Sequence, residues 1–115
     1  MTWGNAKNTC GTVSEGAHLV FITSDQENNE VSRLVKEIHG EQDDWWIGLT
    51  KDGEATGTWK WYNMSVTYTN WAPNEPNNLN GNQNCGELWK WQCDIASWND
   101  KECTMQRSFI CEKEK

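Results

Sequence analysis

The chain has 115 residues, with 17 acidic and 10 basic side chains and a net charge of −7. This length fits one domain, and we expect residues 1–115 to form it. Lysine and arginine never cluster beyond a pair, which disfavours a protein that binds nucleic acid. No apolar run is long enough for a membrane span.

Five cysteines are present, and no two of them have the spacing of a zinc site. A disulfide framework is favoured instead, which predicts a secreted protein or the extracellular domain of a membrane receptor. Because five is an odd number, one cysteine is either free or paired outside the chain. His18 and His39 have no catalytic partner nearby in the sequence, so we expect both to be structural.

Two helices are predicted in the first third of the chain. The first covers residues 3–14. The second begins at Ser24, which forms a capping box with Glu27, and it ends at Gly40, which fits a left-handed cap. Apolar residues recur at helical spacing between these limits.

Short strands are predicted along the rest of the chain. We expect them at residues 17–23, 45–50, 57–63, 86–91 and 108–113, with a further short strand at 66–68. Helices near the start and strands later indicate an α+β fold. We expect most of the nine tryptophans to fill the core and one or two to be exposed.

Residues 63–85 lack a strand or helix pattern and are rich in asparagine. A loop of this length in a compact domain is usually functional or disordered. It contains Glu75 and Asn77, while Asn99 and Asp100 stand side by side further on. Carboxylate and amide oxygens are the ligands that calcium prefers. The alternative is a solvated turn region, because asparagine and proline also favour turns.

The sequence resembles the C-type lectin domain over nearly its whole length. The segments that carry the resemblance are WGNAKNTC (3–10), GAHLVFI (16–22), WIGL (46–49), WKW (59–61), NWAPNEPN (70–77), WND (98–100) and FICE (109–112). It implies two helices, small antiparallel sheets and a long calcium-binding loop, stapled by disulfides. The family's opening strand has no counterpart here, so we expect a domain trimmed at its N-terminus.

The resemblance also implies how the cysteines pair. It joins Cys10 to Cys111 and Cys85 to Cys103. Cys93 is then left over, in a segment that is slightly longer than usual for the family. We expect it to be a thiol, with an intermolecular bridge as the alternative.

The resemblance implies one calcium site, with a cis peptide bond before Pro76. Its ligands would be Glu75, Asn77, Gln83, Asn99 and Asp100. Gln83 stands where the family usually has glutamate, so one negative charge is lost and we expect weaker calcium binding. If the Gln83 oxygen faces the ion, its NH2 group is left to face the sugar. A second site is expected to be absent, because its positions hold Lys51, Ala55, Asn78 and Asn84.

The function implied is binding of mannose, fucose or N-acetylglucosamine through two adjacent hydroxyls that coordinate the calcium. The five ligands would also bind the sugar, and the EPN order matches the mannose-type subgroup. Trp89 and Trp91 either belong to the core or stack on the sugar. The alternative function is binding of a protein or ice surface by the same fold.

We expect no enzymatic activity, because no nucleophile has a recognisable base. A minor alternative is a glycosidase centre formed by the paired carboxylates of Glu75 and Asp100. The expected partners are glycans, with oligomers formed through regions outside this chain or through Cys93. Asn63 begins an N-glycosylation sequon and is a candidate for modification.

Overall fold

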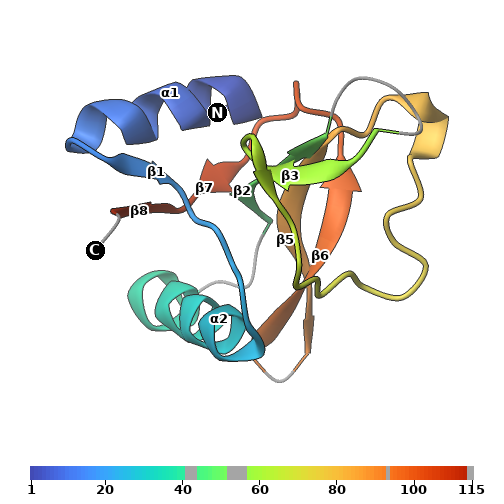
Figure 1. Cartoon of the computed structure of the whole chain (residues 1–115). Coiled ribbons are helices and arrows are strands. Elements are labelled where there is room, and N and C mark those ends of the chain that lie inside the picture. The colour runs from blue at the N-terminus through green and yellow to red at the C-terminus, as the bar shows by residue number, and fades with distance from the viewer. Residues whose placement is uncertain (41–43, 52–56, 93, 114–115) are drawn as a thin grey trace.

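The structure is a computed structural model that describes residues 1–40, 44–51, 57–92 and 94–113. Within these ranges, α1 and α2 lie on opposite sides of the strands (Figure 1). The elements are α1 (Trp3–Val13), β1 (Ala17–Leu19), α2 (Asp25–His39), β2 (Trp45–Lys51), β3 (Trp59–Trp61), β4 (Met64–Ser65), η1 (Leu79–Gly81), β5 (Cys85–Gln92), β6 (Ile95–Lys101), β7 (Ser108–Phe109) and β8 (Cys111–Lys113). None of the described helices is long and apolar enough to cross a membrane.

The second helix forms as predicted, and its ends explain why. The Ser24 side chain accepts a hydrogen bond from the Glu27 backbone N–H at 3.1 Å. Glu27 in turn accepts from the Thr23 backbone N–H at 3.1 Å, so the capping box closes one residue earlier than expected. At the other end, Gly40 has φ 69° and donates to the Lys36 carbonyl, as a left-handed cap does.

The larger sheet is built around β2. This strand pairs antiparallel with β3 and β5, and its first residues pair parallel with β7. β6 continues the sheet beyond β5, and β4 continues it beyond β3. A second sheet contains β1 and β8, which pair antiparallel. The predicted strand at residues 108–113 is therefore divided between the two sheets.

The structure corrects one predicted strand and contains one strand that was not predicted. Residues 66–68 form no strand, although Val66 and Tyr68 pack against the core and so produce an apolar pattern. The hairpin partner of β3 is instead β4, slightly earlier in the chain. Conversely, β6 was not predicted, because its polar residues read as a loop.

Tryptophan fills the core, as expected. Trp46, Trp61 and Trp98 are all fully buried, and the rings of Trp61 and Trp98 meet edge to face with centroids 5.5 Å apart. All nine tryptophans lie in the described ranges, and only Trp89 is exposed, at 38%. A small domain with few leucines thus gains its buried apolar area from large aromatic rings.

Both predicted disulfides are present. Cys10 of α1 is bonded to Cys111 of β8 across 101 residues of sequence, and Cys85 is bonded to Cys103. The second bond links the start of β5 to the segment that follows β6. Cys93 lies outside the described residues.

Buried polar side chains join α2 to β6. Asn28 donates from its side chain to the Ala96 carbonyl at 2.9 Å and accepts from the Trp98 indole N–H at 2.9 Å. The Ser32 hydroxyl accepts from the Ala96 backbone N–H at 3.0 Å. These bonds fix where β6 lies, and β6 carries Asn99.

Candidate functional site

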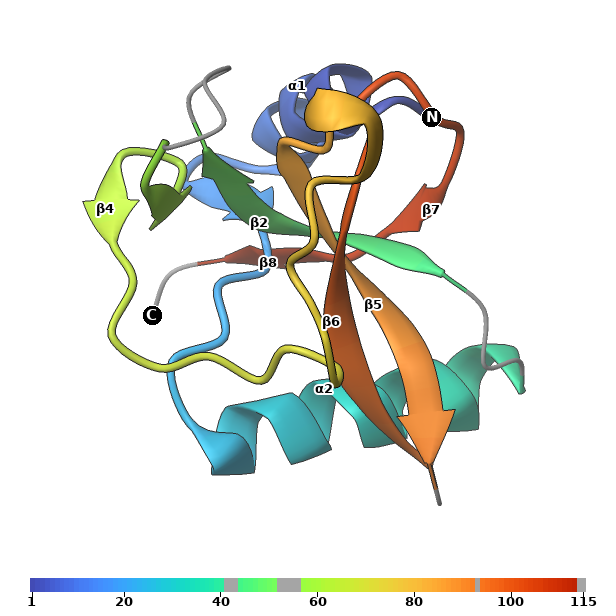
Figure 2. The same ribbon diagram turned by 90° about the vertical axis from the view of Figure 1, so that its right-hand side faces the viewer.

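The long loop between β4 and β5 is fastened to the open edge of β6. The Trp98 backbone N–H donates to the Asn70 carbonyl, and the Ala72 backbone N–H donates to the Trp98 carbonyl, both at 2.9 Å. The Asn70 side chain adds a bond to the Ala96 carbonyl at 3.1 Å. Figure 2 shows this loop, in yellow, running beside β6. The pairing brings the residues after Ala72 to the end of β6.

Part of the loop's asparagine content follows from its backbone. Asn74 and Asn78 adopt left-handed conformations, with φ of 70° and 48°. Asparagine reaches this region more readily than other residues with a Cβ, because its short side chain can hydrogen-bond locally. The peptide bond between Glu75 and Pro76 is cis, as predicted.

Asp100 is the centre of the site. It is fully buried near the end of β6, opposite Gly86 of β5. Its two carboxylate oxygens accept hydrogen bonds from the backbone N–H groups of Asn77 and Asn78, at 3.2 and 2.6 Å. These charge-assisted bonds hold the loop against β6.

Glu75 faces Asp100 and is short of partners. Its Oε1 atom is buried and has no hydrogen-bond partner. Burial raises the pKa of Glu75 above its ordinary value, and the hydrogen bond and negative charge of Asp100 raise it further, against a smaller opposing effect of the Asn77 backbone N–H. Two carboxylates held together in this way are stabilised by a shared cation.

The amide oxygens of Asn77 and Gln83 converge on one N–H group. The backbone N–H of Leu79 donates to Asn77 Oδ1 at 3.2 Å and to Gln83 Oε1 at 3.1 Å. Gln83 is only 4% exposed, and its Nε2 group donates to Glu102 at 3.0 Å. Its NH2 group therefore faces Glu102 in this structure.

Asn99 precedes Asp100 on β6 and is oriented by the ion pair between buried Glu87 and partly exposed Arg107. Its Nδ2 group donates to Glu87 Oε2 at 3.0 Å, and Arg107 Nε donates to Glu87 Oε1 at 3.0 Å. Burial raises the pKa of Glu87, while the bonds from Asn99 and Arg107 lower it. Because the amide nitrogen is engaged, the Asn99 oxygen is the atom left to bind a cation.

Sequence reasoning missed Glu87, Arg107 and Glu102. Glu87 is 1% exposed inside β5, and a charge within a buried strand is a signal that it has a partner. Nothing in the sequence identifies that partner as Arg107, twenty residues later. Glu102 carries no signal of its own.

The structure does not bring Trp89 and Trp91 to this site. Trp91 pairs with Ala96, whereas Asp100 lies four residues further along β6, roughly 13 Å away at the usual rise of a strand. A register shift between Leu88 and Lys90 breaks the alternation of β5. Trp91 therefore packs against the core while Trp89 is exposed.

Other predicted positions are also located. Asn63 is exposed in the turn between β3 and β4. The Lys51 ammonium lies 5.4 Å from the centroid of the Trp59 ring, where it makes a cation–π contact. Asn78 accepts from the Gln83 backbone N–H at 3.1 Å. Ala55 lies outside the described residues.

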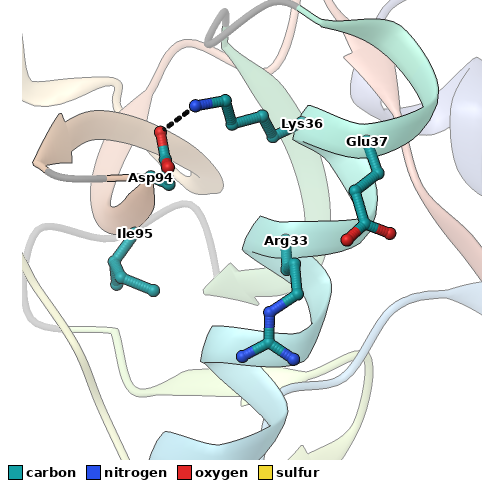
Figure 3. Close-up of a pocket in the computed structure, with 5 residues that line it drawn as sticks. All are labelled: Arg33, Lys36, Glu37, Asp94 and Ile95. Atoms are coloured by element: carbon teal, nitrogen blue, oxygen red, sulfur yellow. Dashed lines mark hydrogen bonds and ion pairs between the residues drawn. The ribbon is translucent and has the colours of Figure 1, made fainter.

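A separate hollow of about 500 Å³ lies between α2 and the start of β6 (Figure 3). It is lined by Arg33, Lys36, Glu37, Asp94 and Ile95. Lys36 reaches across it to Asp94 at 2.5 Å. Two cations and two anions line this surface, so its charges balance, and it contains none of the predicted ligands.

The residues near Asp100 fit a hard cation. In the described part of the chain, no three His, Cys, Asp or Glu side chains cluster as metal ligands. The set at Asp100 differs because it combines two carboxylates, Glu75 and Asp100, with amide oxygens. Calcium accepts both kinds of oxygen. The unpartnered oxygen of Glu75 is an atom that such an ion would satisfy.

Comparison with known proteins identifies the class. The family described as Lectin C-type domain matches residues 1–113. The chain is 31% identical over 112 residues to a C-type lectin of Cerberus rynchops, covering 96% of this chain and 70% of that protein. It is 33% identical over 111 residues to a C-type lectin mannose-binding isoform of Oxyuranus scutellatus, covering 96% of this chain and 69% of that protein.

A solved structure agrees with these sequences. The C-type lectin CEL-I of Cucumaria echinata superposes with a TM-score of 0.85 at 27% identity, covering 96% of this chain and 81% of that one. The chain belongs to the C-type lectin domain family. Its two helices, antiparallel sheets and two disulfides are the α+β fold predicted from the sequence.

Proposed function

We propose that the site formed by the loop and the end of β6 binds one Ca²⁺ and, through it, sugars of the mannose type. The observation that carries the proposal is the buried, unpartnered oxygen of Glu75 beside the carboxylate of Asp100. An isolated pair of this kind is costly, because two negative charges repel and one oxygen lacks a partner.

Five side chains would hold the ion: Glu75, Asn77, Gln83, Asn99 and Asp100. Two of them are carboxylates, so their charge matches that of a divalent cation. The hydrogen bonds of Asp100 keep the loop in place, and the Glu87–Arg107 pair orients Asn99. Bound calcium would supply free coordination positions for two adjacent sugar hydroxyls.

Glu75 and Asn77 would set the sugar preference. A carboxylate only accepts hydrogen bonds, whereas an amide can also donate. Glu75 would therefore accept a hydrogen bond from one hydroxyl, and Asn77 would donate a hydrogen bond to that hydroxyl's oxygen. This acid-then-amide order matches the mannose-type lectins, and one similar protein is named a mannose-binding isoform. N-acetylglucosamine and fucose belong to the same class of ligand.

The proposed site would bind its ligand without catalysing a reaction. Its partners would be extracellular glycans. The two disulfides support folding in an oxidising compartment. The protein would then be secreted or form the extracellular part of a receptor. Multivalency, through regions outside this chain or through Cys93, would raise the avidity of a weak single site.

The test is a calorimetric titration of calcium into chelator-treated protein. Wild type should bind one ion, and Glu75→Gln should lose most of the heat. Glu15→Gln is the matched control, because Glu15 is exposed directly after α1 and is not a proposed ligand. Equal calcium binding by wild type and Glu75→Gln would contradict the proposal.

A further inference from the structure

Gln83 raises a specific question, because the resemblance to the family implies a glutamate at this position. With glutamine here, the proposed site keeps two carboxylates among its ligands. Gln83 is nevertheless buried and has a partner at each end of its amide. These partners determine which atom of the Gln83 amide faces the other proposed calcium ligands.

The orientation of the Gln83 amide follows from the polarity of its neighbours. The Leu79 backbone N–H can only donate, so it requires the amide oxygen at 3.1 Å. The Glu102 carboxylate can only accept, so it requires the NH2 group at 3.0 Å. The reverse orientation would place donor against donor and acceptor against acceptor.

Glu102 is held in position by its own surroundings. It directly follows β6, two residues after Asp100, and its carbonyl accepts from the Met105 backbone N–H at 3.1 Å. The next residue, Cys103, is bonded to Cys85, which lies two residues after Gln83. The disulfide therefore holds the two chain segments together beside the pair.

We propose that Glu102 is a positioning residue and that the Gln83–Glu102 pair replaces a single carboxylate at position 83. Glu102 turns the amide oxygen of Gln83 toward the ligand loop and adds a negative charge one side chain behind it. This inference rests on the proposed calcium site. A consequence is that Gln83→Glu would not improve the site, because it would place two carboxylates about 3.0 Å apart.

The test compares calcium affinity in three variants, measured by calorimetry. Glu102→Gln should weaken binding roughly 10- to 100-fold, the usual effect of losing a residue that orients a metal ligand. Gln83→Glu alone should also bind more weakly than wild type. The double variant Gln83→Glu/Glu102→Gln exchanges the two groups and should recover wild-type affinity or better.

Glu30→Gln is a matched control. Glu30 also accepts from a glutamine, Gln26, at 3.2 Å, but on the exposed face of α2. Nitrogen-15 NMR of the calcium-free protein provides a second readout, because the side-chain NH2 signals of Gln83 should shift in Glu102→Gln and stay unchanged in Glu30→Gln. This readout does not require calcium to bind.

The outcomes separate this inference from the proposed function. Failure of wild type to bind calcium would overturn the calcium site and, with it, the role of the pair. If wild type binds calcium and the calcium affinity of Glu102→Gln is within twofold of wild type, only the proposed role of the Gln83–Glu102 pair is refuted. Tighter binding by Gln83→Glu alone would also refute the pair, as would Gln83 NH2 signals that do not respond to Glu102→Gln.

Discussion

Replacing Asn28 by alanine should destabilise the domain far more than the same change at its neighbour. Asn28 is 1% exposed, and it bonds to both the Trp98 indole and the Ala96 carbonyl. Ala96 would keep its second bond, from Asn70, at 3.1 Å. The Trp98 indole N–H would lose its hydrogen bond to Asn28 and would remain buried.

The magnitude follows from these contacts. A buried donor left without a partner costs about 1–3 kcal/mol, and the lost bond to Ala96 adds about 1 kcal/mol. Asn28→Ala should therefore lower the free energy of unfolding by roughly 2–4 kcal/mol. In a domain of this size the corresponding fall in Tm is roughly 10 °C or more.

Urea denaturation monitored by tryptophan fluorescence measures this directly, with calcium chelated in every sample. Asn29→Ala is the matched control, because Asn29 is the next residue of α2 and is exposed. It should change the free energy of unfolding by less than about 0.5 kcal/mol. If the free energies of unfolding of the two variants differ by less than about 0.5 kcal/mol, the bonds between α2 and β6 do not stabilise the fold as proposed.

Three further changes have predicted directions. In the folded protein the pKa of Glu75 lies above its ordinary value of 4.5. Glu75 therefore contributes its full stabilisation below pH 4.5, and this stabilisation is lost as pH rises through the folded pKa. With calcium chelated, Glu75→Gln should remove this pH-dependent loss and make the protein more stable than wild type at pH 7. Replacing Cys10 and Cys111 by serine should cost about 4–5 kcal/mol in urea denaturation, since the bond closes a loop of 101 residues. Gly86→Ala should cost about 1–3 kcal/mol, because the new Cβ would lie 2.7 Å from Leu49 Cβ.

Each of these changes has a control or a contradicting result. A pH profile of stability in Glu75→Gln that matches wild type would refute the proposed role of Glu75. Gly11→Ala lies in α1 with open space around the new Cβ and should be neutral or stabilising. Equal stability of Gly86→Ala and Gly11→Ala would contradict the packing argument. A loss below about 1 kcal/mol for the cysteine variant would contradict the loop-closure argument.

Local signals predicted local structure well. The Ser24 and Gly40 caps defined α2, because capping depends on residues adjacent in the chain. The apolar spacing on this helix was less informative about burial. Val35 is buried, but Leu34 and Ile38 are 50% and 64% exposed.

The supports of the site could not be predicted in the same way. β6 contains polar residues that read as a loop, and it is a strand because β5 pairs along one edge and the loop along part of the other. Glu87 and Arg107 meet across the fold, at positions set by strand register. The resemblance identified the five proposed ligands, whereas the side chains that orient them depend on tertiary packing.

The most direct test of the account is a calorimetric titration of mannose into the protein, first with calcium and then with excess chelator. Galactose serves as the control sugar, because the proposed site, with Glu75 before Asn77, should prefer mannose. We predict heat from mannose with calcium, little from galactose, and none from mannose in chelator. Mannose heat that persists in chelator, or its absence although calcium binds, would contradict the proposal that calcium in this loop binds the sugar.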